Sequence, residues 1–159
     1  MLFTGRYELS IDPKNRLSIP ANVRAELDPE RDGTRFYLVP GVHEGTLRLY
    51  SDRYFERHAE ESSRSLGPGR DKDEFETLFY AMATLMEMDK QGRVLLPQWL
   101  LTKASIGKQV VLTGARDHLV LWNREECDRY LERNWARPAD LLEQARQRGR
   151  ASGAEGPQK

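Results

Sequence analysis

Two short stretches of the chain place an aspartate four residues before an arginine, at Asp12 and Arg16 and again at Asp89 and Arg93. A carboxylate and a guanidinium at this spacing suit three kinds of chemistry. The carboxylates could act as acid–base catalysts, the pair could form a surface salt bridge worth at most about 1 kcal/mol, or the aspartate could orient the arginine toward the edge of a nucleic-acid base. The surrounding residues decide among these roles.

Each motif begins with residues that favour a turn. In "DPKN", Asp12 suits the first turn position and Pro13 the second, while Asn15 tolerates the positive φ that Gly92 adopts more easily in "DKQG". Each stretch therefore predicts a tight hairpin that ends on the arginine. This position explains Asp12, Asp89 and Gly92 as structural residues of the motif, without any catalytic role.

The motif belongs to a longer internal repeat. When Asp12 is aligned with Asp89, the following apolar residues and the proline also align, as "RLSIP" with "RVLLP". Later parts match as well: "FYLVPG" resembles "VVLTGA", and "LRLYSDRYFER" resembles "LVLWNREECDR". Two copies of one structural unit are the simplest account of this pattern.

Each copy predicts the same series of elements. "YELSI" alternates polar and apolar residues as a strand does, the stretch after the turn continues as a second short strand, and a proline then suits the first turn of a short helix. Two further strands and a helix close the copy, and we expect Ser51 and Asn123 to cap these closing helices. The expected strand pairs are 35–39 with 46–50 and 109–113 with 118–122.

The segment between the copies predicts a helical hairpin, since "GPG" interrupts two helical patterns and Phe75, Leu78, Phe79 and Met82 follow at helical spacing. Beyond Asn134 little apolar surface remains, which favours a disordered tail with at most a helical start near Leu141. The expected organisation is a first module over 1–57, a helical connector over 58–80, a second module over 81–133 and a tail over 134–159.

Composition points to a water-soluble globular protein. The 159 residues are 38% apolar, and 25 basic and 25 acidic side chains give a net charge of zero. No stretch is long and apolar enough for a membrane span, and the first residues lack the pattern of a secretory signal, so we expect a cytoplasmic protein. The single cysteine, Cys127, cannot form an internal disulfide and suits a filler position in a helix.

Enzyme signatures are absent from the sequence. Its three histidines, His43, His58 and His118, are scattered and do not stand at metal-ligand spacing with cysteine or with one another. The sequence also contains no phosphate-binding glycine loop and no nucleophile elbow. We therefore expect a protein without catalytic activity, metal or cofactor.

Local charge favours nucleic-acid binding over a simple structural salt bridge. Basic residues gather around both turns, so two hairpin ends present cations that could follow a phosphate backbone. In the first copy these are Arg6, Lys14, Arg16 and Arg24, and in the second they are Lys90, Arg93 and Lys103. The candidate DNA-binding residues are Arg16, Arg93, Lys14, Lys90, Asn15 and Arg6.

Three stretches, "GRYELSIDPKNRLSIPANVRAEL", "MDKQGRVLLPQWLLTKA" and "VVLTGARDHLVLW", together resemble the MraZ family of bacterial transcriptional regulators over roughly Met1 to Arg133. The resemblance implies an α+β fold, mainly β, in which two tandem AbrB-like swapped-hairpin modules form a pseudo-dimeric β-barrel with a helical connector. It also implies a nucleoid-associated, ring-like homo-oligomer that binds double-stranded DNA at short direct repeats. These repeats lie upstream of the protein's own operon for cell division and cell-wall synthesis, which the family usually represses.

The family's DNA-contacting arginines fall on Arg16 and Arg93, and Lys14 and Lys90 occupy adjacent turn positions. The first turn departs from the family pattern, because proline and asparagine replace its more common alanine and glycine. The alternative function is a non-catalytic protein-interaction module. Its motivating feature is the aromatic and methionine content of "FETLFYAMATLMEM", for which core packing is the simpler explanation.

Overall fold

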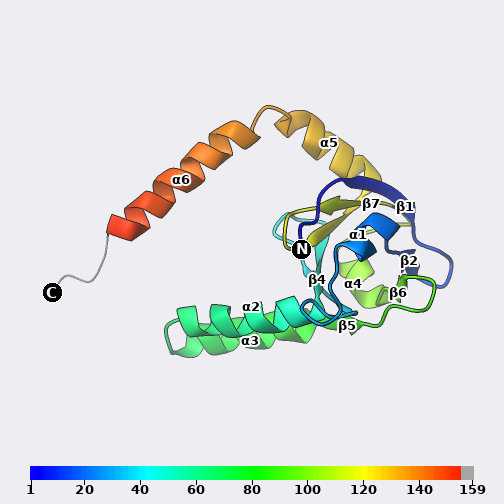
Figure 1. The fold of residues 1–159 in the computed structure, drawn as a ribbon, viewed down its shortest axis with the longest axis horizontal. Helices are drawn as coiled ribbons and strands as arrows, with labels where there is room; N and C mark the ends of the chain where they lie inside the picture. Colours follow the sequence, from blue (N-terminus) through cyan, green and yellow to red (C-terminus); the bar gives the residue numbers. More distant parts are fainter. Residues whose placement is uncertain (155–159) are drawn as a thin grey trace. The chain divides into compact units, whose positions relative to one another are not determined.

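Both repeats contribute strands to one six-stranded antiparallel sheet (Figure 1). In this computed structural model, which describes residues 1–154, the strand order is β1-β7-β8-β4-β3-β5. The first strand of each repeat pairs with a strand of the other repeat, β1 with β7 and β5 with β3, while β4 and β8 join the two halves. The strands are β1 (Arg6–Ser10), β3 (Phe36–Pro40), β4 (Thr46–Ser51), β5 (Thr84–Met86), β7 (Gln109–Gly114) and β8 (Leu119–Asn123).

The expected α+β class is confirmed, with most strands in one main sheet, but this sheet is open and does not close into a barrel. β1 and β5 stand at its two ends and do not pair with each other. Closure requires a continuous ladder around the barrel, and β5 spans only three residues, all paired with β3. A separate two-stranded sheet packs on the main sheet instead.

That second sheet, which we call the ribbon, consists of β2 (Arg16–Ser18) and β6 (Arg93–Leu95) in antiparallel pairing. Leu17 lies opposite Val94, and both side chains are completely buried. Short helices follow the ribbon strands as the prolines predict, α1 (Ala21–Ala25) after β2 and α4 (Gln98–Lys103) after β6.

The main core lies between one face of the six-stranded sheet, the inner face of the ribbon and the two short helices. Alternation along the strands sends every second side chain to this core, as Leu47 and Leu49 of β4 illustrate. Its buried members include Leu17, Val23, Phe36, Leu38, Leu47, Leu49, Val94, Leu100, Leu112 and Leu121.

On the other face of the sheet, α2 (Asp52–Ser65) and α3 (Arg70–Met82) form the predicted helical hairpin. Val39, Tyr50 and Phe55 build a second apolar cluster there, and Phe79 of α3 packs against it. Core packing does not account for the whole apolar side of α3, however, because Phe75 is 46% exposed and Leu78 is 65% exposed.

Residues from Glu125 on form a second compact unit, separate from Met1–Arg124. It contains most of α5 (Arg124–Asn134), followed by α6 (Pro138–Ala154). The structure thus differs from the expected disordered tail, and the helix is far longer than a start near Leu141. Alanine, leucine, glutamate, glutamine and arginine, which are strong helix formers, fill most of 139–148, and a proline suits the first helical position, so local propensity favours a helix there even though Gly149 and Gly153 do not. The last part of the predicted tail, 155–159, lies outside the described residues.

The expected capping of the closing helices is wrong for Ser51, whose side chain makes no capping hydrogen bond. The N–H groups of Asp52 and Arg53 donate to carbonyl oxygens of the loop before β3 instead. Asn123 accepts a hydrogen bond from the N–H of Gly107, with an N–O distance of 2.7 Å, so its side chain ties β8 to the loop before β7. At the start of α2, tertiary contacts therefore take over what local capping was expected to do.

We expect Leu17→Ala to lower the free energy of unfolding by about 2 to 5 kcal/mol, because it leaves a cavity where the ribbon meets the core. The matched control is Leu95→Ala, which changes the same residue type on the exposed face of the partner strand, where the side chain is 62% exposed. This control should change the free energy by no more than about 0.5 kcal/mol. Urea denaturation measures both, and similar losses would contradict the placement of the ribbon faces.

Candidate nucleic-acid interface

In the first turn, the Asp12 carboxylate organises both the backbone and the arginine. Its Oδ1 accepts hydrogen bonds from the N–H groups of Lys14 and Arg16, each at 2.9 Å, and its Oδ2 accepts one from Arg16 Nε at 2.7 Å. The Asp12 N–H donates to the Arg16 carbonyl at 3.0 Å, and Asn15 has the predicted positive φ of 62°. One side chain thus closes the turn and orients the guanidinium.

The second turn repeats this geometry almost atom for atom. Asp89 Oδ1 accepts from the N–H groups of Gln91 and Arg93 at 2.9 and 3.0 Å, and its Oδ2 accepts from Arg93 Nε at 2.9 Å. Gly92 has a φ of 77°, in the place where the first turn uses asparagine. Two unlike turn sequences, "DPKN" and "DKQG", therefore present an arginine in the same way.

These hydrogen bonds lower the pKa of both aspartates. For Asp12 the largest cause is the N–H of Arg16, and for Asp89 it is the N–H of Arg93; the guanidinium of the same arginine adds to the effect. Each carboxylate therefore stays ionised and keeps Nε occupied. The two Nη groups of each arginine make no hydrogen bond within residues 1–154, so they are available to a ligand.

The ribbon brings both arginines onto one exposed face. Directly opposite residues in an antiparallel pair point to the same side, so Arg16 shares a face with Leu95, and Arg93 shares it with Ser18. Leu17 and Val94 point the other way, into the core. The exposed face of the ribbon, which we call the reading face, thus carries the two arginines at diagonal positions, with Leu95 opposite Arg16 and Ser18 opposite Arg93.

Sequence reasoning missed Ser18 and Leu95 as site residues. The signal was present, because alternation with period two places Ser18 on the side of Arg16 and Leu95 on the side of Arg93. The significance of that side appears only with the β2–β6 pairing, which joins residues far apart in the chain.

Each turn also receives a cation from the opposite repeat. Lys108 Nζ donates to Asn15 Oδ1 at 2.7 Å, at the first turn. Arg24, which the sequence grouped with the first turn, instead lies over Gly92 of the second, where an added Cβ would come within 2.7 Å of its Nε. Neither contact is visible in the sequence, since each crosses from one repeat to the other.

The remaining candidate residues are placed differently from one another. Lys14 and Lys90 are exposed at the tips of the two turns. Both polar atoms of the Asn15 side chain are used inside the protein, because its Nδ2 donates to Gln98 while its Oδ1 accepts from Lys108. Arg6 begins β1, at the end of that strand away from the turn, and forms a 3.0 Å ion pair with Glu8.

A search of residues 1–154 finds no group of three or more histidine, cysteine, aspartate or glutamate side chains placed to hold a metal ion. Within the same residues, no helix has the length and apolar character that crossing a membrane requires.

Comparison with known proteins identifies the duplicated architecture. A family model described as "MraZ protein, putative antitoxin-like" matches twice, at residues 2–74 and 79–148, so that each match contains one Asp–Arg turn. The chain belongs to the MraZ family. The duplication inferred from the sequence is thereby confirmed as two copies of the MraZ repeat.

Curated relatives in the MraZ family are similar over most of their length. The chain is 37% identical to "Transcriptional regulator MraZ" of Mycoplasmopsis pulmonis over 82% of this chain and 84% of that protein. Proteins of the same name from Heliobacterium modesticaldum and Desulforamulus reducens are 36% and 35% identical, over 83% and 81% of this chain and 88% and 87% of theirs. The expectation of a MraZ transcriptional regulator rather than an enzyme is confirmed by these relatives.

The lowered aspartate pKa values predict how the turns respond to acid. A carboxyl group whose pKa is lower in the folded state stabilises the fold above its unfolded pKa, near 3.8, and loses this contribution as the pH falls through the folded value. The double variant Asp12→Asn/Asp89→Asn should therefore melt at a lower temperature than the wild type at pH 7.

The difference in melting temperature should shrink as the pH falls below about 4, because the wild-type carboxylates then become neutral as well. Circular dichroism melts between pH 7 and pH 2 measure this. Asp71→Asn, at an exposed position on α3, is the control and should not reproduce the pattern. A difference that is constant with pH would show that the turns do not depend on ionised aspartates.

Proposed function

We propose that this protein is a sequence-specific DNA-binding transcriptional regulator that represses the division and cell-wall operon to which it belongs. It binds double-stranded DNA at short direct repeats upstream of that operon and is therefore expected on the nucleoid. The observation that carries the proposal is the pair of equivalent Asp–Arg turns, which place Arg16 and Arg93 on one exposed face of a two-stranded ribbon.

The dimensions and chemistry of the reading face suit the major groove. That groove admits a two-stranded β-ribbon, and an arginine donating two hydrogen bonds to guanine O6 and N7 is its commonest specific contact. Each aspartate accepts from Nε, so the two Nη groups of Arg16 and of Arg93 are left for the base. A guanidinium oriented in advance loses less conformational entropy on binding, which favours specific contact over loose attraction.

Basic side chains around the reading face suit the DNA backbone. Lys14 and Lys90 at the turn tips, with Arg24 and Lys108 beside the turns, would lie near phosphates when the ribbon occupies the groove. We assign Asn15 to shaping the first turn rather than to contacting DNA, because its side chain is already hydrogen-bonded. Arg6 has a distant position on β1 and carries no part of the proposed contact.

Repetition supplies the affinity that one ribbon lacks. One reading face neutralises only a few phosphates, and each neutralised phosphate changes log K against log salt by about −0.9 in B-DNA, so a single contact is weak and salt-sensitive. If protomers assemble in a ring and the DNA carries evenly spaced repeats, later contacts are effectively intramolecular. Avidity then exceeds single-site affinity by about 10² to 10⁴. The net charge of zero keeps non-specific attraction to DNA low.

The reading face is chemically asymmetric although its backbone is nearly symmetric. Ser18, a hydrogen-bonding residue, occupies the position in the first repeat that the apolar Leu95 occupies in the second. Leu95 suits the C5-methyl group of thymine, whereas Ser18 suits polar base edges. A ribbon of this kind prefers a site whose two halves differ, which is consistent with direct rather than inverted repeats.

Arg16→Ala and Arg93→Ala should each remove base discrimination, lowering the preference for cognate over scrambled DNA by about 5- to 150-fold, the range expected for one bidentate arginine–guanine contact. Lys14→Ala should weaken binding to both DNAs alike and reduce the salt slope by about one. Fluorescence anisotropy on DNA from upstream of the operon, with scrambled DNA of equal length and a salt series, measures these effects.

Two results would contradict the proposal. Equal affinity of the wild type for cognate and scrambled DNA would remove sequence-specific regulation. Equal losses on both DNAs for Arg16→Ala would remove its role in reading bases. Arg64→Ala, on the exposed surface of α2, is the matched control for loss of one positive charge and should leave the preference unchanged.

Leu95→Ala should reduce affinity for cognate DNA about fourfold, the effect of losing one buried methyl-sized contact of about 0.8 kcal/mol. Replacing thymine by uracil at each position of the repeat removes only the C5-methyl group, and one such replacement should weaken the wild type to a similar extent. The same replacement should have no further effect on Leu95→Ala. Anisotropy titrations of both proteins on the substituted DNAs measure this, and additive losses would show that Leu95 does not contact that methyl group.

A further inference from the structure

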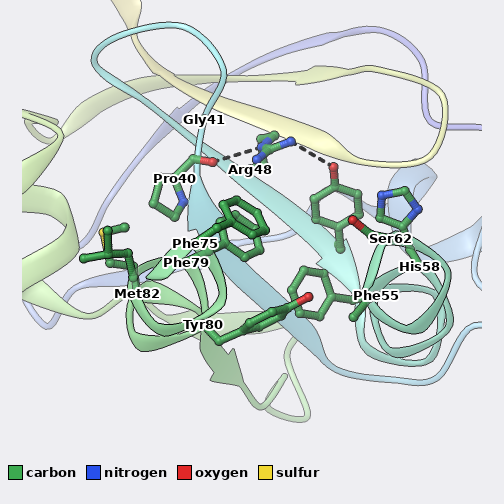
Figure 2. A pocket seen from close by; sticks show the side chains of 13 residues that line it. Pro40, Gly41, Arg48, Phe55, His58, Ser62, Phe75, Phe79, Tyr80 and Met82 are labelled. Carbon is green, nitrogen blue, oxygen red and sulfur yellow. Dashed lines mark hydrogen bonds between the residues drawn. The ribbon is translucent and has the colours of Figure 1, made fainter. Parts of the chain in front are cut away.

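A groove separates the α2–α3 hairpin from strands β3 and β4 (Figure 2). It has a volume of about 400 Å³ and opens on the face of the sheet away from the ribbon core. Figure 2 shows Phe75 and Phe79 of α3 on one side of the space and His58 and Ser62 of α2 on the other. The two phenylalanine rings stack with centroids 5.5 Å apart, which gives the groove a flat aromatic wall.

One positively charged side chain, that of Arg48, lines this mainly apolar groove. Arg48 of β4 donates from Nε to the Pro40 carbonyl at 3.0 Å and from Nη1 to the Tyr50 hydroxyl at 3.2 Å (Figure 2). Within residues 1–154, no carboxylate lies within ion-pair distance of Arg48, and no aspartate or glutamate lines the groove. Its Nη2 donates to no group among these residues. A half-buried positive charge without a negative partner favours an anionic ligand.

Tyr50 provides a second donor at the same point. The residue is only 6% exposed, and burial raises the pKa of its hydroxyl, with a smaller contribution from the Asp117 carboxylate, so the group stays protonated. Within residues 1–154 this hydroxyl has one hydrogen bond, in which it accepts from Arg48, and its own proton has no acceptor. The Tyr50 O–H and the free Nη2 of Arg48 therefore meet at one end of the groove.

We propose that this groove binds a small amphipathic anion, a carboxylate attached to an apolar chain or ring. The carboxylate would accept hydrogen bonds from Arg48 and Tyr50, and the apolar part would lie against Phe75 and Phe79. The volume falls within the range of about 300 to 1,000 Å³ that is typical of small-molecule sites, which also combine aromatic walls with a few polar groups. Such a ligand would also cover Phe75 and Leu78, whose side chains remain exposed to solvent in residues 1–154.

The test compares octanoate with octanol, two probes of equal chain length that differ in the charged head group. Isothermal titration calorimetry on the full-length protein at pH 7 should show that octanoate binds about 10-fold or more tightly than octanol. This ratio corresponds to the contribution of one charge-assisted hydrogen bond, at least about 1.5 kcal/mol. Arg48→Gln should abolish this preference while leaving octanol affinity unchanged. Arg70→Gln makes the same substitution on the exposed surface of α3, outside the groove, and should behave as the wild type.

Tyr50→Phe keeps the ring and removes only the hydroxyl, so it tests the site even if Arg48→Gln does not fold. It should weaken octanoate and spare octanol. Equal affinities of the wild type for the two probes, or no binding of either, would overturn the proposal. If neither probe binds and Leu78→Ser lowers the oligomeric mass in analytical ultracentrifugation, the groove is instead a contact between copies of the chain. The site does not depend on DNA binding, so its failure leaves the proposed regulator function untouched.

Discussion

β2 and β6 each span three residues and pair with each other in a two-stranded sheet. An isolated two-stranded ribbon of this size is only marginally stable in water. Burial of Leu17 and Val94 against the main sheet supplies the missing stability. The pairing also decides where the opposite face points, and with it the positions of Arg16 and Arg93. The placement of Leu17 and Val94 in the core and of the two arginines on the reading face both depend on this one antiparallel pairing.

The aspartate of each turn joins local stability to the proposed recognition. It accepts two backbone hydrogen bonds that close the turn and one from Nε that orients the arginine. The simple interpretation of the motif as a structural salt bridge and its interpretation as a DNA-reading device are therefore not alternatives. The same carboxylate closes the turn and orients the arginine, because its two oxygens accept from different donors.

The main sheet separates the ribbon core from the α2–α3 hairpin, one on each of its two faces. Along β4, Leu47 and Leu49 enter the core beneath the ribbon, while Arg48 and Tyr50 face the α2–α3 hairpin. Pleating alone produces this division, since successive side chains point to opposite sides. The ribbon that carries the proposed DNA contact and the groove proposed for an amphipathic anion thus lie on opposite faces of the main sheet and share no residues.

The sequence by itself determined the local features: the two turns, the positive φ at Asn15, the strand pairs, the short helices after proline and the helical hairpin. These features follow from backbone steric preferences and from hydrophobic periodicity, and both can be read from a few consecutive residues. Tertiary structure alone decided that the sheet is open and that Leu95 lies exposed beside Arg16. It also decided that Arg24 and Lys108 each lie at the turn of the opposite repeat. It also replaced the expected Ser51 cap with carbonyl groups from a distant loop. Each of these depends on which strand pairs with which and in what register, and that choice is made by burial of the whole core rather than by any local pattern.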